Sequence, residues 1–337
     1  MAELALRDRD EQGTVGTTEK SFGRRLAELR EIGLLAAVVA LFVVLSILRP
    51  DTFFTTDNVI GIAQRISLLT IIAVGMTFVF IVGEIDLSVG SMYGLLAIGL
   101  STMVVIHGWN PAVALPAVIV AGAALGFINR FITTWFGIPS FIVTLGMLAI
   151  LRGVVLSWIQ VPPFGRIGGW FDTIFGARWH NVPAQVFWMV GVVIIASWVL
   201  SRTRFGYHVY ATGGNPLAAA NAGINVKRTK IICFMILGAL TGFSAAIITG
   251  WLHGVSRSHG QGYELDVIAA VVVGGTALSG GSGSVFGTFL GACLIGLIGN
   301  GLILLGANSE TEQIAKGVVI IAAVMLDTAI RRRQRIA

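Results

Sequence analysis

Ten long apolar segments divide this 337-residue chain, and they constrain its fold more than any other feature. Each is close to the roughly 20 helical residues that cross a bilayer core of about 30 Å. Because hydrocarbon offers no water to unpaired backbone groups, such segments cross as α-helices. We place them near 32–49, 58–82, 88–107, 112–135, 139–160, 184–201, 229–252, 264–279, 285–305 and 312–330. The sequence therefore predicts an all-α, polytopic membrane protein with about ten transmembrane helices.

The charged side chains are concentrated at the two ends of the chain. Residues 1–31 hold 13 of the 40 charged residues and residues 331–337 hold four, which leaves 23 for the 299 residues between. A soluble domain carries about 25% charged residues throughout. This excludes a soluble enzyme, a disordered protein and, because the basic residues lie at membrane edges, a nucleic-acid binder. We expect a polar tail over 1–31, a transmembrane domain over 32–330 and a basic tail over 331–337.

The distribution of Lys and Arg predicts that both termini and both tails are cytoplasmic. With the N-terminus inside, sixteen of the 23 basic residues fall on the cytoplasmic side. The same orientation puts the loop 202–228 in the cytoplasm and the loop 161–183 on the outer side. Within the outer loop, residues 168–175 are expected to form a short interfacial helix.

Two parts of the chain share an ordered set of features. The acidic turn 83–87 (GEIDL) opens the third segment and 262–266 (GYELD) opens the eighth, while Asn129 and Asn300 lie in the fourth and ninth. The offset between the two copies falls from 180 to 171 residues. Because five crossings separate them, each element runs opposite to its counterpart, which predicts an inverted repeat of helices 2–5 and 7–10. Chance similarity among glycine-rich helices is the alternative.

A few polar residues interrupt the apolar segments. A carboxylate within hydrocarbon costs about 2.5–3.5 kcal/mol on insertion scales, so it must be paired, hydrated or interfacial. Uncharged polar groups there are able to hydrogen-bond sugar hydroxyls without holding an ion. The candidate substrate-path residues are Glu84, Asp86, Ser88, Asn129, Thr133, Thr144 and Asn300. The alternative is a structural role, in helix starts, caps and bonds between helices.

Small residues predict close helix packing in the seventh segment. Gly238, Gly242, Ala246 and Gly250 recur at every fourth position, which gives one face that a second helix can approach. After the short eighth segment, the glycine-rich stretch 274–284 predicts a helix end, a turn or a broken helix.

The sequence contains no signature of a cofactor or a catalytic site. None of its four lysines follows a glycine, so a P-loop is excluded. Cys233 and Cys293 lie in separate apolar runs, and the five histidines show no ligand spacing. We therefore expect a non-enzymatic chain with no metal site and no cofactor of its own.

The loop 202–228 predicts a short exposed helix on the cytoplasmic face. Asn215 suits an N-cap and Pro216 a first helical position. An alanine-rich run continues the helix and Gly223 ends it. Its small side chains offer a partner a shallow projection, and a plain connecting loop is the alternative.

Several stretches together resemble the permease subunit of bacterial monosaccharide ATP-binding-cassette importers, the ribose, xylose, arabinose and galactose type. They are Gly75-Met76-Thr77, 83–91 (GEIDLSVGS), 137–146 (GIPSFIVTLG), Arg152-Gly153, 203–230 and 260–287 (GQGYELDVIAAVVVGGTALSGGSGSVFG). Similar permeases commonly have Gly-Gly or Ser-Gly where this chain has Gly83-Glu84, so the carboxylate of Glu84 departs from the pattern of the resemblance.

The resemblance implies a permease in the bacterial inner membrane, surrounded by lipid, that forms a homodimer around a monosaccharide path. It implies a periplasmic sugar-binding protein on the outer side and a cytoplasmic ATPase subunit that holds ATP and Mg. On this resemblance the coupling helix that docks into the ATPase comprises Asn215, Pro216, Ala219, Ala220, Gly223 and Ile224.

Two other classes remain as alternatives. An ion-coupled secondary sugar transporter would act without an ATPase and would need an ionisable group near mid-membrane, where Arg65 and Arg152 are the nearest candidates. A signalling or structural membrane protein is disfavoured by the repeat. The sequence does not name the sugar.

Overall fold

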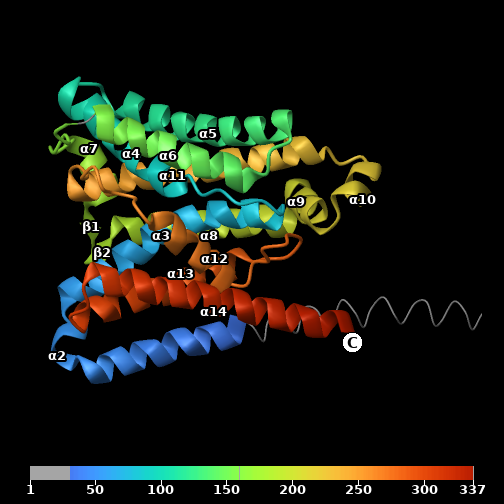
Figure 1. The fold of residues 1–337 in the computed structure, drawn as a ribbon. Helices are drawn as coiled ribbons and strands as arrows, with labels where there is room; N and C mark the ends of the chain where they lie inside the picture. Colours follow the sequence, from blue (N-terminus) through green and yellow to red (C-terminus); the bar gives the residue numbers. More distant parts are fainter. Residues whose placement is uncertain (1–30, 159, 337) are drawn as a thin grey trace, which may run out of the picture.

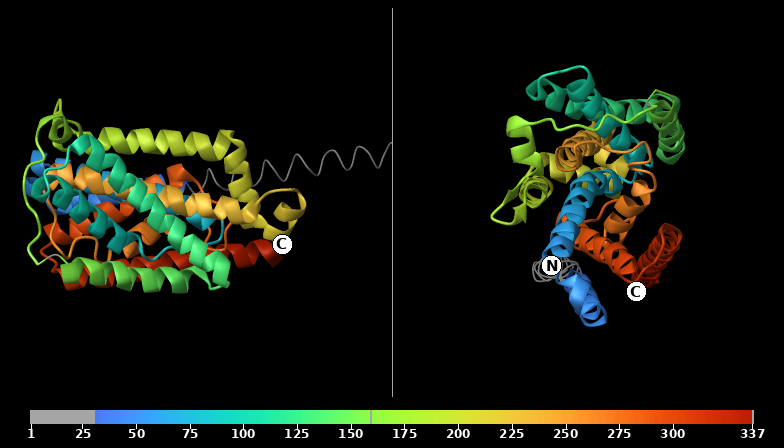
Figure 2. Two further views of the ribbon diagram at one scale, coloured as in Figure 1. Left: turned by 90° about the horizontal axis from the view of Figure 1, so that it is seen from above. Right: turned by 90° about the vertical axis from the view of Figure 1, so that its left-hand side faces the viewer.

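A computed structural model describes residues 31–158 and 160–336 of the chain, and these are almost entirely helical (Figure 1). The elements in chain order are the helix Glu31–Leu48, α2 (Pro50–Phe53), α3 (Thr56–Ile81), α4 (Val89–Ser101), the π-helix η1 (Thr102–Ile106), α5 (Pro111–Phe136), α6 (Ser140–Trp158), α7 (Gly169–Phe171), the π-helix η2 (Asp172–Gly176), β1 (Arg178–Trp179), β2 (Val182–Pro183), α8 (Ala184–Arg202), α9 (Arg204–Gly214), α10 (Pro216–Asn221), α11 (Val226–Leu252), α12 (Tyr263–Val273), α13 (Val285–Leu304) and α14 (Ser309–Ile336). The long helices run side by side along one bundle, with Glu31–Leu48 at its edge (Figure 2).

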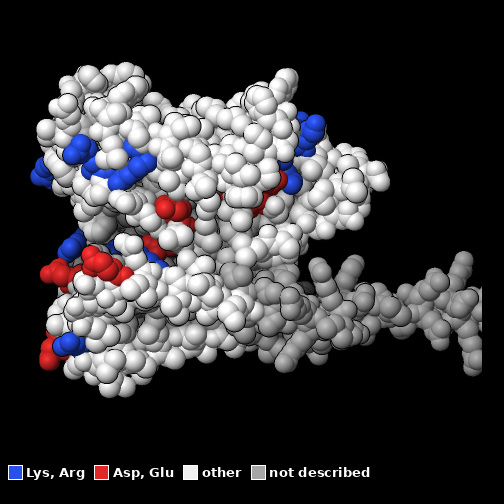
Figure 3. Space-filling view, in the orientation of Figure 1, with Lys and Arg blue, Asp and Glu red and all other residues white. Residues whose placement is uncertain are grey.

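Eight helices among the described residues are long and apolar enough to cross a membrane. α3 lies at the centre and is mostly buried, whereas α5, α6 and α8 expose large apolar side chains such as Trp135, Ile142 and Ile194 on the outer surface. An apolar exterior is what lipid tails require. On the face drawn in Figure 3, the Lys and Arg side chains lie toward the two ends of the bundle. The prediction of an all-α, polytopic membrane protein is confirmed.

The eighth predicted crossing, 264–279, is too long. α12 contains 11 residues and stops at Val273. Gly274 and Gly275 follow it, and Gly275 has a φ of +98°, which a residue with a side chain rarely adopts. α4, its counterpart in the repeat, is also short, with 13 residues before the π-helix η1. α12 therefore ends early, as the glycine-rich stretch after it predicts, whereas α4 continues into η1 to complete the 18-residue span Val89–Ile106.

The helices of the two repeats run in opposite directions. Figure 1 shows that α3 and α11 are antiparallel, and so are α4 and α12, α5 and α13, and α6 and α14. This is the order and the reversal that the predicted inverted repeat requires.

The glycine stripe of α11 lies against α5. Gly238 and Gly122 pack so closely that a Cβ on either would overlap the carbonyl oxygen of the other, and a Cβ on Gly242 would lie 2.7 Å from the Val118 oxygen. Ala246 is fully buried. Further along, a Cβ on Gly250 would lie 2.8 Å from Cβ of Phe175 in η2.

One end of the bundle carries the segment between α6 and α8. α7 and η2 occupy the place of the predicted interfacial helix, 168–175. A small hairpin that the sequence does not predict follows, in which Arg178 pairs with Pro183 and Trp179 with Val182. The opposite end carries α9, which lies across the ends of the long helices, and α10 (Figure 2). Residues 1–30 of the predicted N-terminal tail fall outside the described residues.

Candidate functional site

The predicted substrate-path residues separate into two regions. Six of them, all except Asn300, lie in or beside the loop 82–88 that joins α3 to α4. Asn300 lines a cavity elsewhere, among α3, α11, α12, α13 and α14. In the first region most polar groups are hydrogen-bonded within the chain, but Asn129 Oδ1 and Arg130 Nε are buried without a partner among the described residues.

Asp86 in the loop 82–88 is fully buried and hydrogen-bonded within the chain. Its Oδ1 accepts from the Ser88 backbone N at 2.8 Å and from Ser88 Oγ at 2.6 Å. Its Oδ2 accepts from Asn129 Nδ2 at 3.0 Å, and the same amide donates to Ser88 Oγ at 2.9 Å. All three residues are 0% exposed. This arrangement favours the structural alternative, in which these residues hold the loop in place.

Glu84 joins the same loop to two helices. Its Oε1 accepts from Arg130 Nη1 on α5 at 2.8 Å and from Lys230 Nζ on α11 at 2.6 Å. The three side chains are only 9–14% exposed. The sequence does not identify Arg130 or Lys230 as a partner of Glu84. No local signal does so, because the pairing crosses three elements.

The start of α6 holds the loop from a third side. Thr144 Oγ1 accepts from the Leu87 backbone N at 3.0 Å, and Ser140 Oγ accepts from the Ile85 backbone N at 3.3 Å. Thr133 differs, because its hydroxyl donates to the Asn129 carbonyl oxygen within α5. Thr133 is therefore near the loop without binding it.

α9 contacts the end of α3 and the glycine-rich loop 274–284. The Gly281 backbone N donates to the Ile81 oxygen at 2.8 Å, and Tyr210 Oη donates to the Gly283 oxygen at 2.8 Å. Gly213 sits so close to Ile81 that a Cβ would overlap the Ile81 carbonyl oxygen. Two loops from the two halves of the repeat thus meet under α9.

α10 follows α9 and is the short helix predicted after Asn215. Asn215 Oδ1 accepts from the backbone N atoms of Leu217 and Ala218, both at 3.1 Å. Gly223 after the helix has a φ of +83°. Leu217 is 80% exposed and is the most prominent apolar side chain of the projection.

Two of the six predicted coupling residues do not face outward. Ala219 is 4% exposed and Ile224 is 8% exposed, because one side of α10 packs against α9 and α11. Ala219 and Ile224 therefore face the body of the protein and not the surface of the projection. Asn215, Pro216, Ala220 and Gly223 are exposed.

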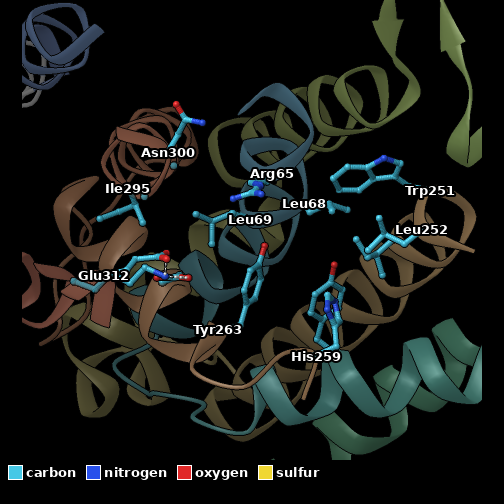
Figure 4. Close-up of a pocket in the computed structure, with 16 residues that line it drawn as sticks. Arg65, Leu68, Leu69, Trp251, Leu252, His259, Tyr263, Ile295, Asn300 and Glu312 are labelled. Atoms are coloured by element: carbon cyan, nitrogen blue, oxygen red, sulfur yellow. Dashed lines mark hydrogen bonds and ion pairs between the residues drawn. The ribbon is translucent and has the colours of Figure 1, made fainter. Parts of the chain in front are cut away.

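The second region is a cavity of about 450 Å³. Aromatic rings form one part of its wall, and a group of charged residues forms another (Figure 4). Lys316 Nζ on α14 lies 2.9 Å from Asp266 Oδ2 on α12 and 2.8 Å from Glu312 Oε1. The principal lining residues are Arg65, Tyr93, Trp251, His259, Tyr263, Asp266, Asn300, Glu312 and Lys316. Of these, only Asn300 is a predicted substrate-path residue.

Three polar atoms in the cavity wall are buried without a hydrogen-bond partner in the described part of the chain. They are Asp266 Oδ1, His259 Nε2 and Asn300 Oδ1. Burial lowers the pKa of His259 to about 4 from its usual 6.5, so the imidazole is neutral at neutral pH. Its ring centroid lies 4.8 Å from that of Tyr93, which in turn lies 5.2 Å from Tyr263.

No group of three or more His, Cys, Asp or Glu side chains suited to a metal ion is found in residues 31–158 and 160–336. Cys233 is buried and Cys293 is half-buried, and both are free thiols.

Comparison with known proteins places the chain in a family. Residues 58–324 match the branched-chain amino acid transport system / permease component family. The ribose import permease protein RbsC of Escherichia coli (strain K12) is 40% identical over 322 residues, which cover 92% of this chain and 98% of the relative. RbsC of Bacillus subtilis (strain 168) is 37% identical, with coverage of 89% and 93%, and the D-allose transport system permease protein AlsC of E. coli (strain K12) is 34% identical, with coverage of 89% and 91%.

No solved structure matches the chain. The matched segment nevertheless spans both halves of the repeat, from the start of α3 into α14, and the relatives are covered almost end to end. The chain therefore belongs to this permease family and is a multi-pass membrane permease of the monosaccharide ATP-binding-cassette importer type.

Proposed function

We propose that the chain forms the translocation path of an ATP-driven monosaccharide importer and is moved by a separate ATPase subunit that docks on α10. The observation that carries the proposal is the position of α10, a capped and exposed projection at one end of the bundle. Its small side chains leave Leu217 standing out as an apolar contact. Apolar anchors of this kind provide much of the affinity in protein interfaces.

The contacts of α9 support a route from α10 into the membrane domain. α9 ends at Gly214 and α10 begins at Pro216, so the two helices are joined by Asn215 alone. Gly213 packs directly against the end of α3 and the loop that contains Gly281. A partner that binds the two states of the permease differently would shift α9 and with it these two loops.

The remaining parts of the importer follow from this arrangement. The ATPase would hold ATP and Mg, and a periplasmic sugar-binding protein would dock at the opposite end, where α7 and the β1–β2 hairpin lie. We propose a homodimer with both termini in the cytoplasm of the bacterial cell. The substrate is a monosaccharide of the class named for the relatives, such as ribose or allose.

A secondary transporter driven by an ion gradient fits the site less well. The carboxylate of Glu84 is paired with two cations, and Asp86 is occupied by internal hydrogen bonds. A carrier needs an ionisable group free to exchange its ion during transport. The membership in the importer family supports the ATP-driven mechanism.

Co-purification with the ATPase subunit tests the docking role of α10. We expect Leu217→Asp to abolish co-purification and ATP-driven sugar uptake, because a charge would replace the apolar contact. Val161→Asp is the matched control for co-purification of the ATPase, since Val161 is equally exposed at 81% but lies in the loop after α6, at the opposite end of the bundle. A Leu217→Asp variant that retains both the ATPase and normal uptake would refute the docking role.

A further inference from the structure

We propose that the cavity bounded by α3, α11, α12, α13 and α14 is a transit site where the permease itself binds one uncharged monosaccharide through its hydroxyl groups. The inference rests on the proposed transport function and adds to it where the sugar is held. Binding of the sugar in this cavity does not require the ATPase subunit to be docked on α10.

The size and lining of the cavity suit one sugar ring. Its volume of about 450 Å³ lies within the range of roughly 300–1,000 Å³ typical of small-molecule pockets. Tyr263 and Trp251 contribute aromatic surface, on which the C–H faces of a sugar can pack, and the fully buried Tyr93 stacks behind Tyr263. Figure 4 shows the ring of Tyr263 between the ion pairs on one side and His259 on the other, with Arg65 beyond the hydroxyl group of the tyrosine. The cavity wall therefore presents both apolar surface and hydrogen-bonding groups to a bound sugar.

The unpaired polar atoms point to a ligand rich in hydroxyl groups. Asp266 Oδ1 and Asn300 Oδ1 are acceptors without donors, and His259 Nε2 is a third unpaired atom in the same wall. The side chain of Asp266 is 13% exposed and Asn300 is 8% exposed, so bulk water reaches neither freely. A buried acceptor left unpaired is costly, and a donor supplied by a ligand removes that cost. A polyol supplies several such hydroxyls at once.

The charges around the cavity favour a neutral ligand. Asp266 and Glu312 carry two negative charges, and Lys316 and Arg65 carry two positive charges, so the wall is balanced. An anionic ligand such as a sugar phosphate would require an excess of positive charge. The site therefore distinguishes a free sugar from its phosphate.

A substitution that fills the cavity tests the inference. Gly299 lines the cavity, and a Cβ there meets only Glu312 Oε1, at 3.4 Å, so a larger side chain extends into the space without a backbone clash. We expect Gly299→Leu to weaken binding of radiolabelled D-ribose or D-allose to the purified full chain in lipid nanodiscs by at least about tenfold. Gly146→Leu on α6, where a Cβ meets nothing within 4 Å, is the matched control and should bind as the unmodified chain does.

A second pair of variants tests the same binding site through a different side chain. His259→Phe retains a ring beside Tyr93 but removes the unpaired nitrogen, and it should weaken binding several-fold. His208→Phe on α9, away from the cavity, should not. D-ribose 5-phosphate should bind more weakly than D-ribose.

The outcomes separate this inference from the proposed function. If Leu217→Asp loses the ATPase yet still binds sugar, the two sites are independent, as expected. Absence of saturable sugar binding to the unmodified chain would overturn the transit site, and so would equal binding by Gly299→Leu and Gly146→Leu. Uptake driven without the ATPase would refute the proposed function and leave the sugar-binding result standing.

Discussion

Lys230 Nζ on α11 lies 2.6 Å from Glu84 Oε1, and so ties the loop between α3 and α4 to a helix of the other repeat. The same oxygen accepts from Arg130 on α5. A carboxylate placed between two cations makes this loop a junction of three elements rather than a free segment.

Removing the Glu84 charge should destabilise the fold. Glu84→Gln would leave Arg130 and Lys230 facing each other with little exposure to water, and breaking a buried ion pair from one side costs about 3–5 kcal/mol. We expect a clear drop in the thermal unfolding midpoint of the detergent-solubilised protein. Glu310→Gln, which removes an exposed carboxylate at the start of α14, is the control. Equal midpoints for the two variants would contradict the junction role.

Adding one methyl group at Gly213 should uncouple α9 from α3. The Cβ would overlap the Ile81 carbonyl oxygen, and overpacking of this kind costs about 1–3 kcal/mol. We expect Gly213→Ala to lower ATP-driven uptake while the ATPase still co-purifies. The neighbouring Gly214→Ala places a Cβ where nothing lies within 4 Å, and it should transport normally. Equal uptake by the two variants would exclude this contact from the coupling route.

Close approach of α5 and α11 should depend on Gly238. A Cβ there would overlap the Gly122 carbonyl oxygen, so Gly238→Ala should force the helices apart and destabilise the protein by about 1–3 kcal/mol. Gly191→Ala on α8 adds the same methyl group in open space. Unfolding in increasing denaturant should separate the two variants, and an unchanged midpoint for Gly238→Ala would count against close packing.

Lowering the pH should lower the stability of the folded protein through His259. Its pKa is about 4 in the folded protein and about 6.5 when the ring is exposed, so the folded state favours the neutral ring. The stability this residue provides is therefore complete above pH 6.5 and is lost as the pH falls from 6.5 toward 4. His259→Gln cannot gain the proton, and its thermal midpoint should fall less than that of the unmodified chain between pH 7 and pH 5. Parallel curves for the two proteins would show that the ring does not titrate in this range.

Much of the fold follows from the sequence because its signals are local. A run of apolar residues long enough to cross a bilayer must be helical, whatever surrounds it. The caps of α10 are equally local, since Asn215 binds backbone groups only two and three residues ahead. The glycines after Val273 likewise predict that a helix ends near them, although they do not predict that α12 is only 11 residues long.

The partners of the polar residues were decided by the tertiary structure. Glu84 binds cations 46 and 146 residues away, and nothing near it in the chain identifies them. The sequence predicts Asp86 and Asn129 as substrate-path residues, but in the structure they are hydrogen-bonded to each other. The sequence also predicts an exposed helix around Ala219, but this residue is buried because α10 packs on α9 and α11. The sequence by itself determined which segments are helices in the membrane, because backbone hydrogen bonding and hydropathy act over neighbouring residues. Only the packing of those helices decided which polar atoms are satisfied and which three remain unpaired in a cavity, because that depends on contacts between distant segments.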